Sequence, residues 1–461
     1  MNLEAKSRIL KAKTVSFLSS LGAALCDDAV VFLAYLAAIA FRFDFEAPRW
    51  GWSAAVWWYA ISCAIFSISA LAWRCYSAPW RRFDIRQFFS LAGAMSTTCI
   101  ILAIIRLVLD SETFSAWRSP YSIVFMTCFL SLVGMIGIRL LYKAYWRSSG
   151  VKNREILERD ERQFDNTLAA KFIAGKVVMV TGAGGSIGSE IVRQTVSAGA
   201  KKVLLVERSE NALYEIDRHI REMGATNIES IMLDAGDMPR MRAVFERFHP
   251  AIVLHAAAYK HVPLVENNPE VGWENNTLAS ENLAKLSKEA KVERFVLIST
   301  DKAVNPLSVM GKTKRAAEKA VMALNEDGGT SFCAVRFGNV YGSSGSVVPL
   351  FREQIAAMKP ITITHPDMKR YFMTIREAVS LVLQAASRSE RAIYTLDMGE
   401  PVKIVDLAEE MVRQAGLRPY IDIPIVYTGI RPGEKLFEQL DISGRSAYKT
   451  DMAKIYITIC R

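Results

Sequence analysis

Four long apolar runs in the first 145 residues constrain the fold more than any other feature of the sequence. They are Leu21–Phe41, Trp52–Trp73, Phe89–Leu109 and Tyr121–Tyr142. Each run approaches the roughly 20 residues that an α-helix needs to cross a bilayer. The first is too long for a signal peptide and lacks a small-residue cleavage site. We therefore expect a four-span transmembrane region over residues 1–145, with a buried bundle of a soluble protein as the alternative.

The positive charges of the chain indicate how these spans are oriented. The sequence holds 57 Lys and Arg against 47 Asp and Glu, a net charge of +10 that could also suggest nucleic-acid binding. Many basic residues stand before the first run, between the second and third, and after the fourth, which places both ends in the cytoplasm by the positive-inside rule. The charge therefore needs no nucleic-acid partner. These residues are Lys6, Arg8, Lys11, Lys13, Arg74, Arg81, Arg82, Arg86, Lys143, Arg147, Lys152 and Arg154.

Charged residues also occur within or near the apolar runs: Asp27, Asp28, Arg106 and Arg139. Charges inside a membrane are costly, so they invite a functional interpretation. The alternative, which we favour from the sequence, places the two aspartates near an interface and lets the arginines extend toward water.

The rest of the chain divides into a polar linker, residues 146–174, and a nucleotide-binding domain, residues 175–461. The seven cysteines form no Cys-x-x-Cys pair, and the five histidines do not cluster with them. We therefore expect neither a metal site nor a disulfide framework.

A glycine-rich turn opens the second domain. The β-branched run 176–180 is followed by Thr181–Gly188 and then by a helical pattern. Glycines in this context allow a tight turn, a close approach of the backbone to a pyrophosphate, and helix–strand packing. The helix N-terminus then faces the phosphates. The predicted cofactor-binding residues of this turn are Gly182, Gly185, Ser186, Ile187 and Gly188.

Further cofactor-binding residues are expected after the next strands. Glu207 ends the second strand and can accept hydrogen bonds from both hydroxyls of an adenosine ribose, which favours NAD over NADP. Arg208 beside it supports the NADP alternative, because arginine pairs with a 2′-phosphate. Asp234 ends a predicted strand, 231–234, near the adenine. Ala256 and Ala257 follow the strand 252–255 and would let the backbone lie against the cofactor.

The stretch Leu297–Lys314 concentrates groups that carry protons at the end of a buried strand. Open α/β sheets place their chemistry at the carboxyl ends of strands. Met310 and Lys314 lie one helical turn apart, where short-chain dehydrogenases normally carry Tyr and Lys. Since methionine cannot titrate, another group must bind the reacting hydroxyl. The predicted catalytic residues are Thr300, Asp301, Lys302, Met310 and Lys314.

Several motifs together resemble the extended short-chain dehydrogenase/reductase superfamily. Within it they are similar to the membrane-anchored UDP-N-acetylglucosamine 4,6-dehydratases of bacterial polysaccharide and glycan biosynthesis. Members of that family often carry another nucleotide-fold domain where this chain has a linker, and Ala279 stands where a glycine is usual. The motifs are the glycine turn, His255–Pro263, Ser299–Pro306, Met310–Lys314, Val335–Val340, Thr364–Met373 and Arg431–Lys435.

The resemblance implies a four-helix transmembrane bundle followed by an α/β Rossmann-type domain with a parallel sheet. A smaller substrate-binding region would begin at about residue 336. It implies a bacterial inner-membrane protein with a cytoplasmic catalytic domain. The implied partners are a UDP-sugar substrate, the lipid bilayer, a second copy of the chain and other glycan-biosynthesis enzymes at the membrane.

The implied reaction oxidises C4 of the sugar, removes water across C5 and C6, and returns the hydride to C6, so that NAD is regenerated. Thr300 would bind the C4 oxygen, and Lys314 would hold the nicotinamide ribose. Asp301 would be the acid, and Lys302 the base for C5. A neutral Lys302 needs a depressed pKa, which we expect from burial and from Lys314.

Substrate-binding residues also follow from the resemblance, and arginines suit a diphosphate because their planar fork binds two oxygens. Two other functions stay open. A C4 epimerase of the same fold would need no Asp–Lys pair, and a scaffold or nucleotide-sugar sensor would explain Met310. The predicted substrate-binding residues are Lys260, Asn339, Arg370, Arg431 and Glu434.

Overall fold

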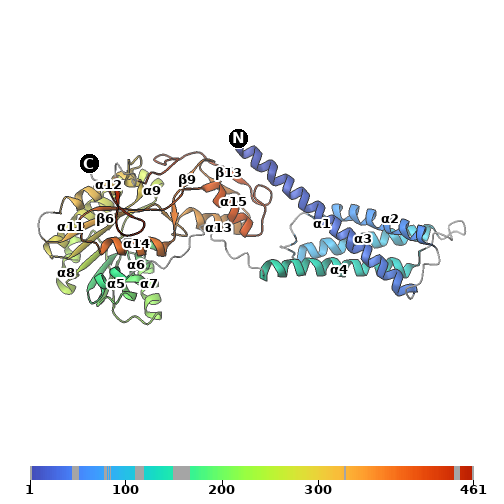
Figure 1. Cartoon of the computed structure of the whole chain (residues 1–461), viewed down its shortest axis with the longest axis horizontal. Helices are drawn as coiled ribbons and strands as arrows, with labels where there is room; N and C mark the ends of the chain where they lie inside the picture. Colours follow the sequence, from blue (N-terminus) through green and yellow to red (C-terminus); the bar gives the residue numbers. More distant parts are fainter. Residues whose placement is uncertain are drawn as a thin grey trace. The chain divides into compact units, whose positions relative to one another are not determined.

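The computed structural model describes residues 3–43, 51–76, 80, 83, 85–109, 119–148, 167–325, 329–440 and 447–458. Most of the predicted linker, residues 149–166, lies outside them. These residues form an N-terminal set of helices and an α/β part (Figure 1).

Each of the four apolar runs forms a helix, as predicted. The helices are α1 (Leu3–Phe43), α2 (Trp52–Ala72), α3 (Ile85–Val108) and α4 (Tyr121–Ser148). Helix α1 begins well before its apolar run, which occupies only the second half of its 41 residues. The four apolar segments span 21 to 24 residues, which is long enough to cross a bilayer.

The helices bury an ion pair, which overturns the interpretation that Asp27 lies near an interface and that Arg139 extends toward water. Arg139 donates to both carboxylate oxygens of Asp27, at 2.8 and 2.6 Å. Both side chains are almost completely buried, at 3% and 1% exposure. The Arg139 guanidinium also stacks over the ring of Trp80, 4.5 Å from its centroid. The apolar surroundings favour this pairing because an unpaired charge there would be far more costly.

The α/β part is built on one nine-stranded sheet. Seven strands run parallel, and β15 and β14 extend the sheet in antiparallel pairing. The order β3-β2-β1-β4-β5-β6 is that of a doubly wound dinucleotide-binding fold. The strands, from one edge to the other, are β3 (Ile228–Met232), β2 (Lys202–Glu207), β1 (Val177–Thr181), β4 (Ile252–His255), β5 (Arg294–Ile298), β6 (Ser331–Arg336), β11 (Ile393–Leu396), β15 (Ile455–Thr458) and β14 (Ala447–Lys449).

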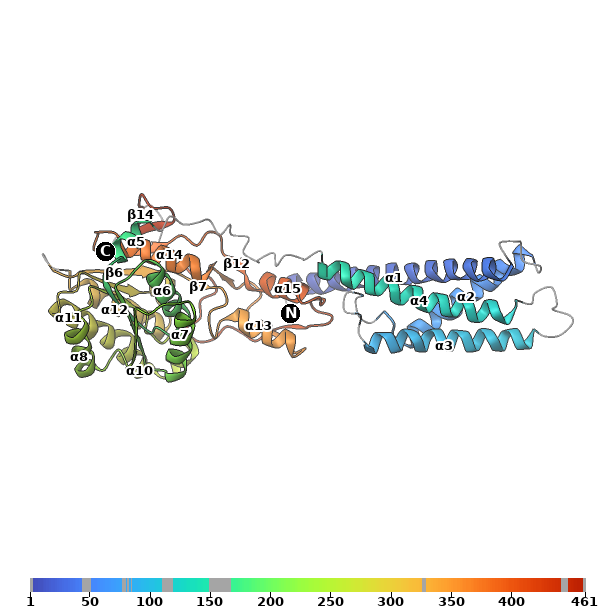
Figure 2. The ribbon, with the colours of Figure 1, turned by 90° about the horizontal axis from the view of Figure 1, so that it is seen from below.

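Alternate residues of the central strands enter two apolar layers, one on each face of the sheet. On β1, for example, Val178 and Val180 join one cluster and Met179 joins the other. Helices cover both faces (Figure 2). They are α5 (Thr167–Ile173), α6 (Ser186–Ser197), α7 (Glu210–Glu222) and α14 (Ile375–Ala386) against the first cluster, and α8 (Met238–Phe248), α11 (Ala279–Glu289) and α12 (Val309–Met322) against the second.

Shorter helices and three small sheets make up the rest of the α/β part. Three two-stranded sheets come from the second half of the α/β part. Strand β3 starts and ends earlier than predicted, so that Asp234 follows the strand and does not end it. The remaining elements are α9 (Val262–Asn267), α10 (Pro269–Trp273), α13 (Val347–Ala356), α15 (Ile404–Gln414), β7 (Asn339–Val340) with β10 (Phe372–Met373), β8 (Ile361–Ile363) with β13 (Ile425–Tyr427), and β9 (Lys369–Arg370) with β12 (Val402–Lys403).

Candidate active site

The glycine turn joins β1 to α6, as the sequence predicted, and its geometry requires glycine at two positions. Gly182 has a φ of +68°, and a Cβ there would lie 2.8 Å from the backbone of Ala257. A Cβ on Gly188 would lie 2.0 Å from the Gly182 carbonyl oxygen. The amide of Gly185 donates to that same carbonyl at 3.0 Å. Side chains at 182 or 188 would therefore push apart the turn that presents the N-terminus of α6.

The other predicted residues of the turn lie in the first turn of α6. Ile187 packs against the apolar core. The Ser186 hydroxyl accepts a hydrogen bond from the amide of Ser344, at 3.0 Å. The turn is therefore tied to a loop that follows β7.

A cavity of about 150 Å³ opens beside this turn and gathers most of the other predicted cofactor-binding residues. Its lining includes Gly182, Gly185, Glu207, Arg208, Asp234, Ala256 and Ala257. The cavity thus follows the carboxyl ends of β1, β2 and β4, the region where doubly wound sheets bind dinucleotides.

The charges of this cavity are arranged around two carboxylates. Glu207 accepts hydrogen bonds from the amides of Gly184 (3.1 Å) and Ser209 (3.0 Å). Arg208 lies 3.5 Å from Asp234 and stacks over the ring of Tyr259, 4.5 Å from its centroid. Arg208 is therefore already paired, while Glu207 leaves this end of the cavity negative.

The predicted catalytic residues Thr300, Asp301 and Lys302 directly follow β5 and form a hydrogen-bonded chain. Thr300 caps the short 3₁₀ helix Asp301–Ala303, since its hydroxyl oxygen accepts from the Lys302 amide at 3.3 Å. The same hydroxyl donates to Asp301 Oδ1 at 2.9 Å, and Lys302 Nζ donates to that oxygen at 3.0 Å. One carboxylate oxygen thus joins a hydroxyl and an amine within a single turn.

The expected depression of the Lys302 pKa is wrong. Burial by itself would lower the pKa, but the carboxylates of Asp301 and Glu438 outweigh burial and raise it. The cation that opposes them is Arg370, and not Lys314 as the sequence suggested. Lys302 is therefore held as an ammonium in this site.

Met310 and Lys314 lie in α12, behind the catalytic turn, and both side chains are buried. Lys314 Nζ donates to the carbonyl oxygen of Ile298 at 2.6 Å. Burial lowers the pKa of Lys314 to about 8, although Glu318 opposes the shift. Burial likewise lowers the pKa of His255 to about 3. His255 hydrogen-bonds to Thr181 and Ser280, at 2.7 and 2.8 Å, so its ring joins β1, β4 and α11.

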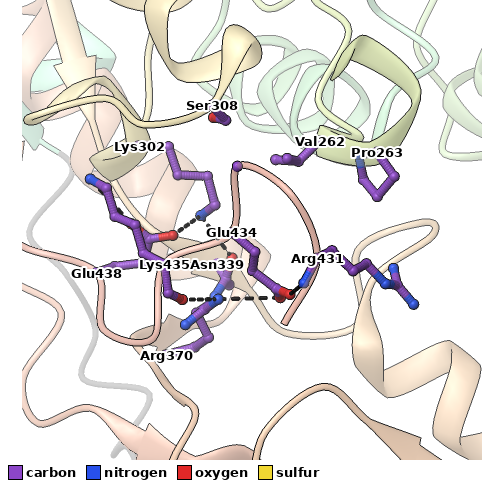
Figure 3. Close-up of a pocket in the computed structure, with 11 residues that line it drawn as sticks. Val262, Pro263, Lys302, Ser308, Asn339, Arg370, Arg431, Glu434, Lys435 and Glu438 are labelled. Carbon is purple, nitrogen blue, oxygen red and sulfur yellow. Dashed lines mark hydrogen bonds and ion pairs between the residues drawn. The ribbon is translucent and has the colours of Figure 1, made fainter. Parts of the chain in front are cut away.

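A second cavity, of about 190 Å³, brings Lys302 together with four of the predicted substrate-binding residues (Figure 3). Asn339 Oδ1 accepts from Lys302 Nζ at 3.3 Å. Arg370 lies 3.4 Å from Glu434. It also donates hydrogen bonds to the backbone carbonyls of Lys435 and Leu436, the two residues that follow Glu434. The Arg431 guanidinium points away from this group. Lys260 is not among the lining residues, and its Nζ donates to the Ser344 carbonyl at 2.7 Å.

Sequence reasoning missed two parts of the site. Glu438 and Lys435 line the same cavity as Lys302. Lys435 is the last residue of the motif Arg431–Lys435 but was not predicted as a site residue, and Glu438 lies beyond that motif. A buried network also lies behind the catalytic strand. Glu318 accepts from Ser299 at 2.6 Å and from two nitrogens of Arg336 at 2.7 Å each. These bonds join β5, β6 and α12, so they hold the strand end against the helix that carries Lys314.

Comparisons with known proteins agree with this geometry. The chain is 49% identical over 294 residues to the capsular polysaccharide biosynthesis protein CapD of Staphylococcus aureus, covering 63% of this chain. It is 47% identical over 293 residues to the probable polysaccharide biosynthesis protein EpsC of Bacillus subtilis, again covering 63% of this chain. The matched region spans 49% of the length of each of these relatives. A UDP-glucose 4-epimerase of Rickettsia felis is 32% identical over 289 residues, which cover 61% of this chain and 82% of that protein.

Solved structures resemble the α/β part of this chain. The structure of Pen from Bacillus thuringiensis is 30% identical, with a TM-score of 0.58, over 62% of this chain and 90% of that one. A dTDP-glucose 4,6-dehydratase from Streptomyces venezuelae, at 19% identity and a TM-score of 0.52 over 57% of this chain and 88% of that one, shares the fold. Residues 178–459, more than half of the chain, match the family described as Polysaccharide biosynthesis protein. The chain is therefore a member of that polysaccharide biosynthesis family, built on the extended short-chain dehydrogenase fold.

Proposed function

We propose that this protein is an NAD-dependent 4,6-dehydratase that acts on UDP-N-acetylglucosamine in the synthesis of a surface polysaccharide or glycan. The observation that carries the proposal is the hydrogen-bonded chain Thr300–Asp301–Lys302, whose Lys302 lines a cavity together with Asn339 and Arg370. A 4,6-dehydratase needs a partner for the C4 hydroxyl, a base for the C5 proton and an acid for the leaving C6 hydroxyl, each within hydrogen-bond reach of its atom. These three adjacent side chains supply them.

The cavity beside the glycine turn fits a dinucleotide. Glycine at 182 and 188 lets the turn pack tightly against the neighbouring backbone, and the N-terminus of α6 that the turn presents suits a pyrophosphate. Glu207 suits the adenosine ribose, and Lys314 the nicotinamide ribose. When bound, NAD would accept the hydride from C4 and would later return it to C6.

The residues at the end of β5 would then move the protons. The C4 hydroxyl proton would pass through the Thr300 hydroxyl to Asp301, because Thr300 already donates to that carboxylate at 2.9 Å. Asp301 would return this proton to the C6 oxygen, which leaves as water. Lys302, once neutral, would take the C5 proton and later restore it. This sequence needs no tyrosine, so Met310 is compatible with activity.

The other cavity would bind the nucleotide side of the substrate. Arg370 and Arg431 suit the diphosphate, and Asn339 and Glu434 suit hydroxyls of the sugar or ribose. Lys260 donates a hydrogen bond to the Ser344 carbonyl in a neighbouring loop. We therefore propose that it lies at the border of this site. The substrate region would be built mainly from residues after about 336.

The proposal is tested by incubating membranes that contain the protein with UDP-N-acetylglucosamine. A product that has lost one water and carries a 4-keto group is expected. A C4 epimerase would change the stereochemistry without a change in mass, and the relationship to a UDP-glucose 4-epimerase makes this the second candidate. Binding without any conversion would support a scaffold or sensor.

Met310→Leu should retain most of the parental activity. The side chain is 3% exposed and packs in α12, so a substitution that conserves volume and polarity should cost less than about 1.5 kcal/mol of stability. The rate of 4-keto product formation is the measurement. A loss as large as that expected for a proton-transfer residue would show that the thioether takes part in the chemistry.

NAD should be the main nucleotide released when the purified protein is denatured. A 2′-phosphate would meet Glu207, and Arg208 is engaged by Asp234 and Tyr259. Glu207→Ser should increase the affinity for NADP about tenfold, which corresponds to roughly 1.4 kcal/mol. Titration of both nucleotides against the parent and the variant measures this. Release of mainly NADP from the parent would show that Arg208 outweighs the two carboxylates.

We also propose that helices α1 to α4 cross the bacterial inner membrane four times, with the linker, residues 146–174, and the catalytic domain, residues 175–461, in the cytoplasm. The basic residues that flank the apolar segments support this orientation. A cysteine introduced at Ser209, which is exposed, should resist a membrane-impermeant thiol reagent in intact cells and react after lysis. Labelling in intact cells would reverse the orientation. Cross-linking in the same membranes would test for a homo-oligomer and for other glycan-biosynthesis enzymes as partners.

A further inference from the structure

Glu438 is a buried carboxylate beside the catalytic turn that the proton transfers described above do not use. Its side chain is 3% exposed, and Oε1 lies 3.7 Å from Lys302 Nζ. Its other oxygen, Oε2, is buried and has no hydrogen-bond partner among the residues that the structure describes. The nearest cation to Oε2 is Lys435, at 3.8 Å. A buried carboxylate with free hydrogen-bonding capacity is costly unless it has a use.

Lys302 presents a chemical problem that Glu438 can solve. Its Nζ faces three oxygens: Asp301 Oδ1 at 3.0 Å, Asn339 Oδ1 at 3.3 Å and Glu438 Oε1 at 3.7 Å. These oxygens favour the ammonium form, which has no lone pair. A base for C5 needs that lone pair, so one proton must leave Lys302 before the sugar can be deprotonated.

We propose that Glu438 is the proton partner of Lys302: it holds the ammonium in the free enzyme and accepts one proton from it in the substrate complex. This inference rests on the proposed dehydratase function. In the step, one N–H bond of Lys302 breaks and its electron pair stays on nitrogen, while an O–H bond forms on Glu438. Lys302 then takes the C5 proton, and the electron pair of the C–H bond enters the enolate. Because Glu438 acts through Lys302, it is a positioning residue.

Exclusion of water supplies the driving force. The Lys302 side chain is 19% exposed to the cavity in the free protein, whereas Glu438 is nearly dry. A sugar in the cavity would remove the remaining water from Lys302. In a dry site separated charges are disfavoured relative to a neutral amine and carboxylic acid, so the proton moves across once the 3.7 Å gap closes to hydrogen-bond distance.

The engagement of Asp301 by two donors leaves Glu438 as the acceptor. Asp301 Oδ1 already accepts from Thr300 and Lys302, and in the proposed reaction Asp301 carries the proton from the C4 hydroxyl. Arg370 faces Lys302 and favours its neutral form.

Glu438→Gln tests the inference through its pH dependence. In the parent the proton stays within the pair, so uptake of solvent deuterium at C5 should be nearly independent of pH between about pH 6 and pH 8. In the variant Lys302 must lose its proton to water. Exchange should then fall by about 10²-fold at neutral pH and rise about tenfold per pH unit. A purely structural loss would lower exchange equally at every pH.

Two variants serve as controls. Glu438→Asp keeps an acceptor with a shorter reach, so it should be slower and still independent of pH. Glu377→Gln removes another buried carboxylate that pairs with a lysine, Lys454 at 2.7 Å, and is not among the residues that line the Lys302 cavity. It should leave the pH profile flat. Thermal unfolding of each variant reports whether it is folded.

The outcomes separate this inference from the proposed function. A flat profile in folded Glu438→Gln, with an active parent, overturns the role of Glu438 alone. The role of Glu438 is supported if Glu438→Gln still forms reduced cofactor and its rate of deuterium uptake at C5 rises about tenfold per pH unit. A parent that forms no 4-keto product overturns the dehydratase proposal and the inference together.

Discussion

A Lys302→Ala enzyme should still oxidise C4 of the sugar nucleotide but should form almost no dehydrated product. The substitution removes the amine that lies 3.0 Å from Asp301 and 3.3 Å from Asn339. Loss of a general base typically reduces a rate about 10²–10⁴-fold. Reduced cofactor should therefore accumulate, while solvent deuterium should no longer enter C5. Absorbance of the reduced nicotinamide and mass spectrometry of the sugar measure the two steps separately.

Lys302→Arg separates the charge of Lys302 from its basicity. Arginine keeps a cation beside Asp301 and Glu438, but it does not lose its proton in proteins. If Lys302 is the base, this variant should be as deficient in C5 exchange as Lys302→Ala. Parental turnover by Lys302→Ala would assign the base to another residue. Recovery by Lys302→Arg would mean that the charge alone suffices.

Asp27→Leu should destabilise the four-helix part by about 3–5 kcal/mol, because it leaves the Arg139 guanidinium buried without its anion. The pair is bidentate, and both side chains are nearly inaccessible. Unfolding of the detergent-solubilised protein by increasing denaturant measures the effect. We expect a smaller effect from Asp28→Asn, since Asp28 is only half-buried and its contact with the Ser67 hydroxyl is 3.3 Å long.

The double variant Asp27→Leu/Arg139→Met separates the effect of the charges from the effect of the side-chain volume. Replacing a buried ion pair by apolar side chains of similar volume is often neutral or stabilising. The double variant should therefore recover most of the stability that Asp27→Leu loses. Equal stability of the parent and Asp27→Leu would show that Arg139 finds water or another anion. That result would contradict the buried pairing.

Much of the architecture follows from local sequence patterns. The four apolar runs predict their helices because length and hydropathy alone decide whether a segment can cross a bilayer. The glycine turn predicts the β1–α6 junction because only glycine fits at Gly182 and Gly188. The position of Thr300, Asp301 and Lys302 after β5 follows equally from the end of an apolar run.

The parts that sequence reasoning missed depend on contacts between distant residues. Glu438 stands more than a hundred residues after Lys302, and only the folded chain shows that they share a cavity. The sequence shows burial of Lys302, which lowers its pKa, but not the second carboxylate that raises it. Nothing local in the sequence indicates that Asp27 and Arg139 form an ion pair, because 112 residues separate them.

That separation has a consequence for how the membrane part is made. A ribosome synthesises about 5–20 residues per second, so Asp27 precedes its partner by several seconds. During this interval α1 has its carboxylate without the guanidinium that neutralises it. If the helices cross the membrane as proposed, we expect α1 to stay near the insertion machinery until α4 arrives. In the proposed topology the ion pair would mark complete insertion, because the carboxylate of Asp27 in α1 meets its cation only after α4 has been inserted.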